Sequence, residues 1–124
     1  MGHKYGKSWG QTVDIETNPF VSFHRAEILE GQGCSRHDHT GRTNLFYCES
    51  GVVLIRVFQP NGLEDETILE AGEMTKVGPH LKHRFEGIED AVVFELYWPR
   101  PMTEVDINRD DVGGPLRPAA KSRR

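Results

Sequence analysis

Hydrophobic and polar residues alternate along most of this chain with a period of two, and almost no stretch shows the longer period of a helix. Eight segments rich in Val, Ile, Phe and Tyr carry this pattern and are predicted as strands: residues 12–15, 21–29, 45–49, 52–58, 66–69, 74–77, 83–85 and 91–98. No segment combines a helix cap with a sustained apolar stripe. The pattern therefore predicts an all-β protein.

Turn-forming residues separate these segments at intervals of about 8 to 12 residues, a spacing typical of a β-sandwich or β-barrel. Most of them are Gly, Pro or Asn, and they fall at Asn18, Gly31, Gly51, Gly62, Gly72, Pro79 and Gly87. The pair Asn61 and Gly62 gives the clearest hairpin signal, because both residues tolerate the positive φ of a tight turn. A closed or sandwiched sheet is the predicted architecture.

The length of 124 residues, 36% of them hydrophobic, fits one compact core. We expect a single domain over residues 1–101, opening with an N-terminal arm. Residues 102–124 contain few large apolar groups and form a predicted C-terminal tail. Two interpretations of the tail remain open: it is disordered, or it docks on the barrel or on a second subunit through Val105, Ile107, Val112 and Leu116.

The formal charge of −4 gives no general attraction to phosphate backbones or anionic lipids, so nucleic acids and membranes are excluded as main partners. No apolar run approaches the roughly 20 residues that span a bilayer, and the first seven residues lack the apolar stretch of an export signal. We therefore expect a cytoplasmic protein in which Cys34 and Cys48 are reduced.

Three histidines are the candidate metal ligands. Strand alternation places His37 and His39 on one face, with backbones about 7 Å apart, which is close enough for both to bind one ion. Asn44, Phe46 and Cys48 share a face of the next strand by the same argument. His83 follows the stiff Gly78 and Pro79 turn on a later strand, so a barrel could bring it opposite the first two.

The spacing of these residues resembles the two motifs of the cupin superfamily. The first motif of that family reads Gly, five residues, His-x-His, three or four residues, Glu, six residues, Gly. It is matched here at Gly31, His37, His39 and Gly51, with Asn44 in place of the Glu. The second motif is matched at Gly72 and His83, with Pro79 displaced by one residue, His80 in the glycine position and Gly87 in the asparagine position.

This resemblance covers about residues 9–98. It implies a double-stranded β-helix, or jelly-roll barrel, holding one divalent transition metal through His37, His39, Asn44 and His83. A narrower similarity, to the cupin domain of type II phosphomannose isomerases, is carried by Trp9 and Gly10, by Ser35 with the two histidines, and by Phe46 and Tyr47. The segment 40–43 is longer here than in that group, and Asn44 replaces its Glu.

Asn44 changes the chemistry of the predicted site. A carboxamide supplies a neutral oxygen instead of an anionic one, so a bound ion stays more electrophilic and is held more weakly. An anionic bidentate substrate would supply the missing charge. Asn44 is interpreted either as a ligand or as a hydrogen-bonding residue beside the site. The ligand set does not distinguish Mn, Fe, Ni, Zn and Cu.

Other side chains are candidates by position. Glu95 is the predicted general base if the last strand turns it inward, and otherwise a surface or interface residue. Arg42 is a candidate for binding an anionic group, or a solvated arginine. Cys48 is a core residue or a redox-sensitive thiol, and His24 and His3 are predicted surface residues. The remaining substrate-binding candidates are Phe46, His80 and Tyr97, of which Phe46 also fits the core and His80 the rim.

Three functions follow as hypotheses. The first is a metal-dependent isomerase, epimerase or lyase acting on a small polar molecule, either sugar-like or a hydroxy or keto acid. The second is a mononuclear non-haem iron dioxygenase. The third is a module that binds or senses a small ligand without catalysis, including a cupin that has kept its fold and lost its metal. Small jelly rolls protect their edge strands by pairing, so a homodimer is expected.

Overall fold

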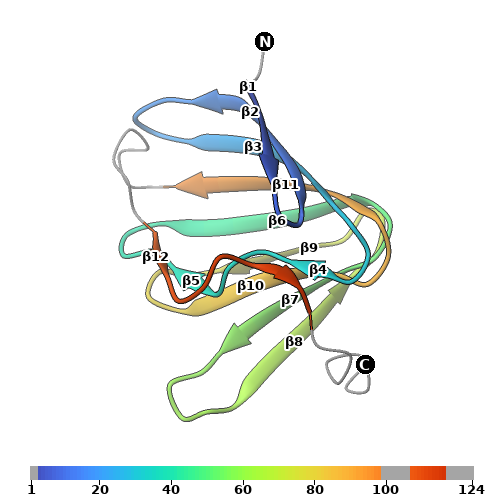
Figure 1. Ribbon diagram of the computed structural model, residues 1–124. Helices are drawn as coiled ribbons and strands as arrows, with labels where there is room; N and C mark the ends of the chain where they lie inside the picture. The colour runs from blue at the N-terminus through green and yellow to red at the C-terminus, as the bar shows by residue number, and fades with distance from the viewer. Residues whose placement is uncertain (1–2, 99–106, 117–124) are drawn as a thin grey trace.

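The computed structural model describes residues 3–98 and 107–116, and all regular structure in those ranges is β (Figure 1). The strands run in the order β1 (His3–Lys7), β2 (Gly10–Thr17), β3 (Ser22–Ile28), β4 (Gln32–Gly33), β5 (His37–Asp38), β6 (Thr43–Ser50), β7 (Val53–Phe58), β8 (Glu64–Leu69), β9 (Met74–Val77), β10 (Lys82–Gly87), β11 (Ala91–Trp98), β12 (Asn108–Arg109) and β13 (Gly114–Pro115). None of the described segments is a helix long and apolar enough to cross a bilayer. The predicted all-β class is confirmed.

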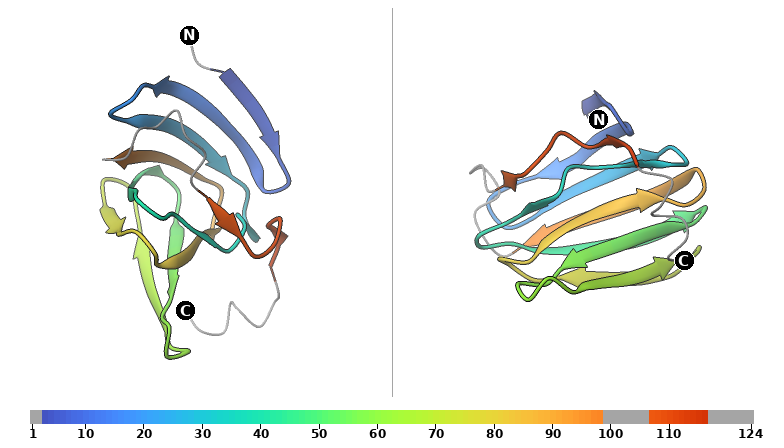
Figure 2. Two further views of the ribbon diagram at one scale, coloured as in Figure 1. Left: turned by 90° about the vertical axis from the view of Figure 1, so that its left-hand side faces the viewer. Right: turned by 60° about the horizontal axis from the view of Figure 1, so that its bottom comes forward.

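Two antiparallel sheets face each other and enclose the interior, as the turned views in Figure 2 show. The first sheet has the order β1-β2-β3-β11-β6-β9. In the second, β10 lies at the centre with β7 and β8 on one side, while the short strands β4 and β5 lie on the other side and pair with β13 and β12. Strands distant in the sequence are therefore neighbours, as a jelly roll requires.

All eight predicted strands are present, and the predicted alternation of faces holds. Along β6, Asn44, Phe46 and Cys48 are buried, whereas Leu45 and Tyr47 between them are only half-buried. The predicted hairpin at residues 61 and 62 joins β7 to β8, although only Gly62 has a positive φ, of 88°. The prediction missed β1, which lies in the segment expected to be an N-terminal arm. It also missed the strands β4, β5, β12 and β13, since two residues are too few to show a period of two.

The hydrophobic core fills the space between the sheets. Its buried members include Trp9, Ile28, Phe46, Ile55, Phe85 and Val93. The rings of Trp9 and Phe85 pack edge to face with their centroids 4.7 Å apart. Buried polar side chains lie on the same inner surface, among them His37, His83 and Glu95.

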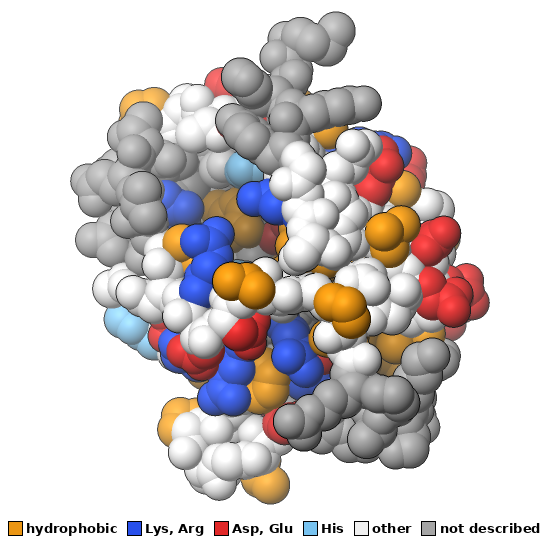
Figure 3. Space-filling model, viewed as in Figure 1, with side chains coloured by type: hydrophobic (Ala, Val, Ile, Leu, Met, Phe, Trp, Pro, Cys, Tyr) orange, Lys and Arg blue, Asp and Glu red, His pale blue; other side chains and the backbone are white. Residues whose placement is uncertain are grey.

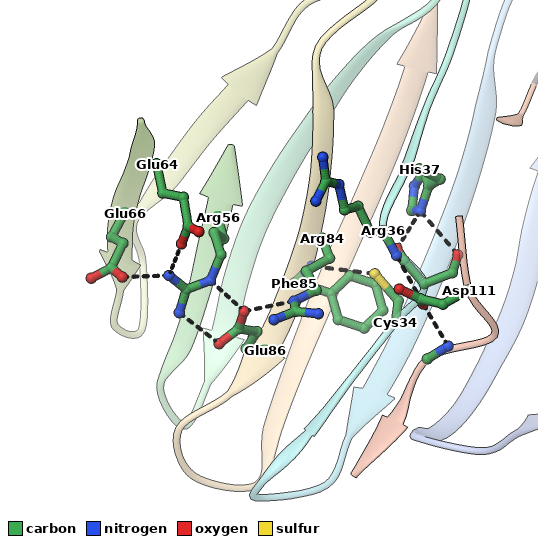
Figure 4. Close-up of polar contacts among 12 residues, drawn as sticks. Cys34, Arg36, His37, Arg56, Glu64, Glu66, Arg84, Phe85, Glu86 and Asp111 are labelled. Atoms are coloured by element: carbon green, nitrogen blue, oxygen red, sulfur yellow. Dashed lines mark hydrogen bonds and ion pairs between the residues drawn. The ribbon is translucent and has the colours of Figure 1, made fainter. Parts of the chain in front are cut away.

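An ion-pair network covers part of the outer surface of the second sheet (Figure 4). Arg56, which is only 1% exposed, donates two hydrogen bonds to Glu86 at 2.6 and 3.0 Å and further bonds to Glu64 and Glu66. Burial opposes ionisation of Glu86, but the bonds from Arg56 and Arg84 outweigh it and lower the pKa of that carboxyl. Arg84 and Glu86 alternate with His83 along β10, so they lie on the opposite face of that strand from His83.

Part of the C-terminal tail belongs to the barrel. Residues 107–116 run along the second sheet, where β12 pairs with β5 and β13 pairs with β4. Asp110 forms ion pairs with Arg36 and Lys82, at 3.1 and 3.0 Å. Val105, one of the apolar positions expected to dock, lies outside the described residues.

Candidate metal centre

Three histidine side chains converge inside the barrel. His37 on β5 is directly opposite His83 on β10, and His39 follows two residues after His37. Their ring centroids lie 4.6 to 5.5 Å apart, and one ring nitrogen from each lies within 4.8 Å of the others. All three residues are buried, with exposures of 6%, 4% and 1% for His37, His39 and His83. The alternation of faces along residues 35–39 is as predicted.

Backbone hydrogen bonds set the orientation of two of these rings. Nδ1 of His37 bonds the carbonyl of Ser35 at 2.6 Å, and Nδ1 of His83 bonds the carbonyl of Leu81 at 2.8 Å. A carbonyl only accepts, so each Nδ1 carries the proton and each Nε2 keeps a lone pair. The Nε2 atom of His83 is buried with no hydrogen-bond partner in the described part of the chain. This is the tautomer that a metal ligand needs.

The surroundings also keep both rings neutral. Burial, together with the neighbouring His83 and His39, lowers the pKa of His37 to about 3. Burial likewise lowers the pKa of His83 to about 4. A neutral imidazole binds a cation and a charged one repels it, so near neutral pH the cluster is ready to accept a divalent ion.

Asn44 and Glu95 form a buried pair on adjacent strands next to this cluster. Asn44 on β6 is fully buried, and its Nδ2 donates to Oε2 of Glu95 on β11 at 3.3 Å. The Oδ1 atom of Asn44 is buried and has no hydrogen-bond partner among the described residues. Glu95 is 7% exposed, so β11 turns it toward the interior, as its candidate role requires.

Tyr97 connects this pair to the histidines. Its hydroxyl donates to Oε2 of Glu95 at 2.7 Å, and its ring packs against the ring of His39 with centroids 5.2 Å apart. Burial of the hydroxyl, and then the charge of Glu95, raise the pKa of Tyr97 well above its ordinary value. Tyr97 therefore remains a hydrogen-bond donor. The guanidinium of Arg42 lies 5.9 Å from the centre of the Tyr97 ring.

A cavity of about 660 Å³ reaches His37 of the cluster. Its apolar walls include Trp9, Phe85 and Ile107, and its polar groups include His24, His37, Glu95 and Tyr97. Lys7 and Arg109 add positive charge to the lining. Figure 3 looks toward this side of the barrel, where hydrophobic side chains lie deep in a hollow and Lys and Arg side chains lie around it. One member of the histidine cluster, His37, thus lines a cavity with room for a small molecule.

The structure corrects the prediction that His24 is a surface residue. His24 lines the cavity, its Nε2 lies 2.5 Å from Oγ of Ser22, and its ring packs edge to face against Tyr97. The sequence contained the signal, because Ser22, Ala26 and Ile28 on the same strand are buried and share the parity of His24.

Cys34 is a second cavity residue that the sequence reasoning did not select. Its sulfur accepts a hydrogen bond from the backbone N–H of Phe85 at 3.2 Å. Burial raises the pKa of the Cys34 thiol, which stays protonated and unreactive. Its sequence position offered no signal, since it lies in a Gly-rich turn whose course only the folded structure defines.

The other predicted substrate-binding residues occupy different places. Phe46 lies beneath the cluster, with its ring centroid 6.1 Å from that of His83. Cys48 is buried toward the far end of β6, where its sulfur lies 3.4 Å from the carbonyl oxygen of Ser50, and it does not line the cavity. His80 is exposed, but its backbone N–H donates to the carbonyl of His39 at 2.7 Å.

Three solved structures have a similar architecture. Oxalate decarboxylase from Bacillus subtilis superposes with a TM-score of 0.75 at 12% identity, over 88% of this chain and 30% of that one. CapF, a capsular polysaccharide assembling protein from Staphylococcus aureus, gives 0.74 at 18% identity, over 90% and 32%. KdgF from Halomonas sp. gives 0.68 at 17% identity, over 81% and 88%.

These similarities establish the fold: the chain has the jelly-roll fold of the cupins. It spans about a third of the length of the oxalate decarboxylase and CapF chains and most of the length of KdgF. No protein-family model and no curated protein sequence matches the chain significantly.

Proposed function

We propose that this chain, a small protein with the cupin fold, binds one divalent transition metal and acts as an enzyme on a small anionic metabolite. The observation that carries the proposal is the convergence of His37, His39 and His83, which are buried and have ring nitrogens within 4.8 Å of one another. His37 of this cluster also lines an open cavity. Three imidazoles on one face leave further coordination positions for a substrate.

The donor set fits such a metal. His37 and His83 are fixed with Nδ1 protonated, and the lowered pKa values keep both rings neutral. The buried Oδ1 of Asn44 is a candidate for a fourth ligand. Bound there, a divalent metal would polarise a carbonyl or hydroxyl oxygen of the substrate. Imidazole and carboxamide donors do not distinguish Mn, Fe, Ni, Zn and Cu.

Glu95 is the group we assign to proton transfer. It is the one carboxylate among the described residues that line the cavity. Tyr97 and Asn44 both donate to its Oε2, which fixes the side chain and leaves Oε1 to face a substrate. Removing a proton from carbon beside a polarised oxygen is the step shared by isomerases, epimerases and many lyases.

The charge of the lining favours an anionic substrate. Lys7 and Arg109 line the cavity, and Arg42 lies beside Tyr97. Two of the structural neighbours are named for related chemistry, one for the dicarboxylate oxalate and one for capsular polysaccharide. A hydroxy acid, a keto acid or an acidic sugar combines oxygen donors for a metal with a carboxylate for the arginines.

Elemental analysis tests the metal. Wild-type protein purified without added metal is expected to contain about one equivalent of a transition metal per chain, and His83→Ala is expected to lose it. His24→Ala is the matched control, because His24 lines the same cavity outside the cluster. A wild type that stays metal-free after incubation with Mn, Fe, Ni, Zn and Cu would overturn the proposal.

Turnover is then measured on hydroxy acids, keto acids and acidic sugars with the metal-loaded protein. Product formation that is lost in Glu95→Gln supports the proposed enzyme. Ligand-induced thermal stabilisation without product would instead indicate a binding module.

A second candidate is a mononuclear iron dioxygenase, which is favoured because the cluster contains three histidines and, within residues 3–98 and 107–116, no carboxylate. It requires oxygen uptake that depends on substrate and vanishes in His37→Ala.

A further inference from the structure

We infer that Glu95 stabilises a bound metal through Asn44. The negative charge missing at position 44 is then supplied by a residue that contacts Asn44 and does not contact the ion. The inference rests on the proposed metal site. In the family that the chain resembles, a Glu at this position is a ligand. Here the carboxylate belongs to Glu95 on the neighbouring strand, β11. Glu95 is thereby a positioning residue for Asn44, in addition to its proposed catalytic role.

Strand pairing brings the two side chains together. Asn44 pairs with Tyr97 across β6 and β11, and Glu95 lies two residues before Tyr97 on the same inner face. The Nδ2 group of Asn44 donates to Oε2 of Glu95 at 3.3 Å, and the Tyr97 hydroxyl donates to the same oxygen at 2.7 Å. Two donors thus hold one carboxylate oxygen.

This bond determines which way the carboxamide points. An ionised carboxylate only accepts hydrogen bonds, so the NH₂ group of Asn44 must face Glu95. Oδ1 is therefore directed away from Glu95, and it is buried without a hydrogen-bond partner among the described residues. An unsatisfied buried oxygen is costly, and a cation would satisfy it.

The same bond strengthens the oxygen as a ligand. An amide that donates to a carboxylate carries more electron density on its oxygen, and such supporting bonds typically change metal affinity by about 10- to 100-fold. Glu95 does not belong to the group of atoms within 4.8 Å of one another, which contains only the three histidines in the part of the chain described. Glu95 is therefore placed to act through Asn44 and not as a ligand itself.

The need for this charge follows from the rest of the cluster. His37, His39 and His83 are uncharged when they bind metal, and a carboxamide is neutral, so this ligand set itself would supply no negative charge to a divalent ion in a buried site. Glu86, a second buried carboxylate, bonds to Arg56 and Arg84. Glu95 is thus the carboxylate available for this role within the described lining.

The test is a titration of metal-free protein with Zn²⁺ in competition with a chromogenic chelator, in the absence of substrate. Glu95→Gln is expected to weaken Zn²⁺ binding by about 10- to 100-fold. Tyr97→Phe, which removes one of the two bonds to Oε2, is expected to weaken it less. Glu49→Gln is the matched control, because Glu49 is an exposed carboxylate on β6 and its variant makes the same change in charge.

A double-mutant cycle isolates the role of Asn44. If Glu95 acts through Asn44, then Asn44→Ala and the double variant Asn44→Ala with Glu95→Gln bind Zn²⁺ equally well. The exchanged pair, Asn44→Glu with Glu95→Gln, returns a carboxylate to position 44 and is expected to recover affinity to within about threefold of the wild type. Recovery in this variant separates a ligand effect from damage to the fold.

The outcomes distinguish the two proposals. A wild type that does not bind Zn²⁺ or any other transition metal removes the metal site itself. A wild type that binds Zn²⁺ with a Glu95→Gln variant of equal affinity overturns only the present inference. An equal loss from Glu95→Gln in the wild-type and Asn44→Ala backgrounds overturns it as well, because Glu95 would then act by its charge alone.

Discussion

His37 and His83 are directly opposite each other on antiparallel strands, with ring centroids 4.6 Å apart and both rings buried. Each ring is held by a carbonyl two residues earlier in the sequence, just before its strand begins. Two imidazolium ions at this separation would repel each other in a low-dielectric interior, so the arrangement is stable only while the rings are neutral or bind a cation.

This pair predicts loss of stability in acid for the metal-free protein. Both residues have an ordinary pKa of about 6.5, lowered in the folded state to about 3 for His37 and about 4 for His83. Above pH 6.5 both states are neutral and the stabilisation is complete. As the pH falls toward 4, the unfolded chain takes up protons that the folded chain refuses, and each histidine lowers the free energy of unfolding by about 1.4 kcal/mol per pH unit.

Urea unfolding between pH 4.5 and 8, in the presence of a chelator, measures this slope. His83→Asn is expected to flatten it by the contribution of one histidine, with His24→Asn as the control variant. Equal slopes for His83→Asn and the wild type would show that His83 does not titrate as the structure indicates.

The backbone conformation of His80 indicates that a substitution there would stabilise the fold. It has a φ of 68°, the one positive value among the described non-glycine residues, and the resembling motif has glycine at this position. A side chain in this conformation costs about 1 kcal/mol, and the exposed ring offers little to offset it. His80→Gly is expected to raise the free energy of unfolding by a few tenths to about 1 kcal/mol.

His80→Ala is the control for this substitution, because it removes the ring and keeps the Cβ atom. Thermal unfolding should leave His80→Ala no more stable than the wild type. Equal stabilisation by both variants would assign the effect to the imidazole and not to the backbone.

Gly31 and Gly51 are the first and last glycines of the sequence motif, but we expect their substitution by alanine to cost different amounts of stability. Their φ values are 77° and 76°, yet a Cβ atom at Gly31 would meet nothing within 4 Å, whereas one at Gly51 would lie 2.0 Å from the carbonyl oxygen of Asp90. Gly31→Ala is expected to cost about 1 kcal/mol from backbone conformation alone. Gly51→Ala is expected to cost several times more, and urea unfolding of the two variants side by side checks the ratio.

Arg56 predicts a large loss of stability remote from the cavity. Arg56→Met leaves the carboxylate of Glu86 buried without its two-bond partner, and breaking such a pair costs about 3 to 5 kcal/mol. The double variant Arg56→Met with Glu86→Leu should recover much of this loss. Arg25→Met, which breaks an exposed pair with Glu27, is expected to cost less than about 1 kcal/mol, and a loss equal to that of Arg56→Met would contradict the assignment.

Local patterns in the sequence predicted the scaffold and the histidine cluster. The alternation of faces depends only on strand geometry, so it placed His37 and His39 on one face without knowledge of the fold. It also placed Glu95 and Tyr97 on one face of the last strand, and the structure showed that this face points inward. The motif spacing added His83 and the position of Asn44. The resemblance added the jelly roll, because the order of strands in the sheets cannot be read from their sequence.

Cross-strand partners, however, were decided only by the tertiary structure. The bond between Asn44 and Glu95 joins residues 51 positions apart, the register of β6 on β11 brings Tyr97 beside Asn44, and β12 places Arg109 opposite His37. The alternation of side chains along a strand determines which residues share a face. It does not determine which strand lies beside that strand, or in what register the two pair. The sequence by itself therefore determined that three histidines share the interior, and tertiary pairing determined which carboxylate accompanies them.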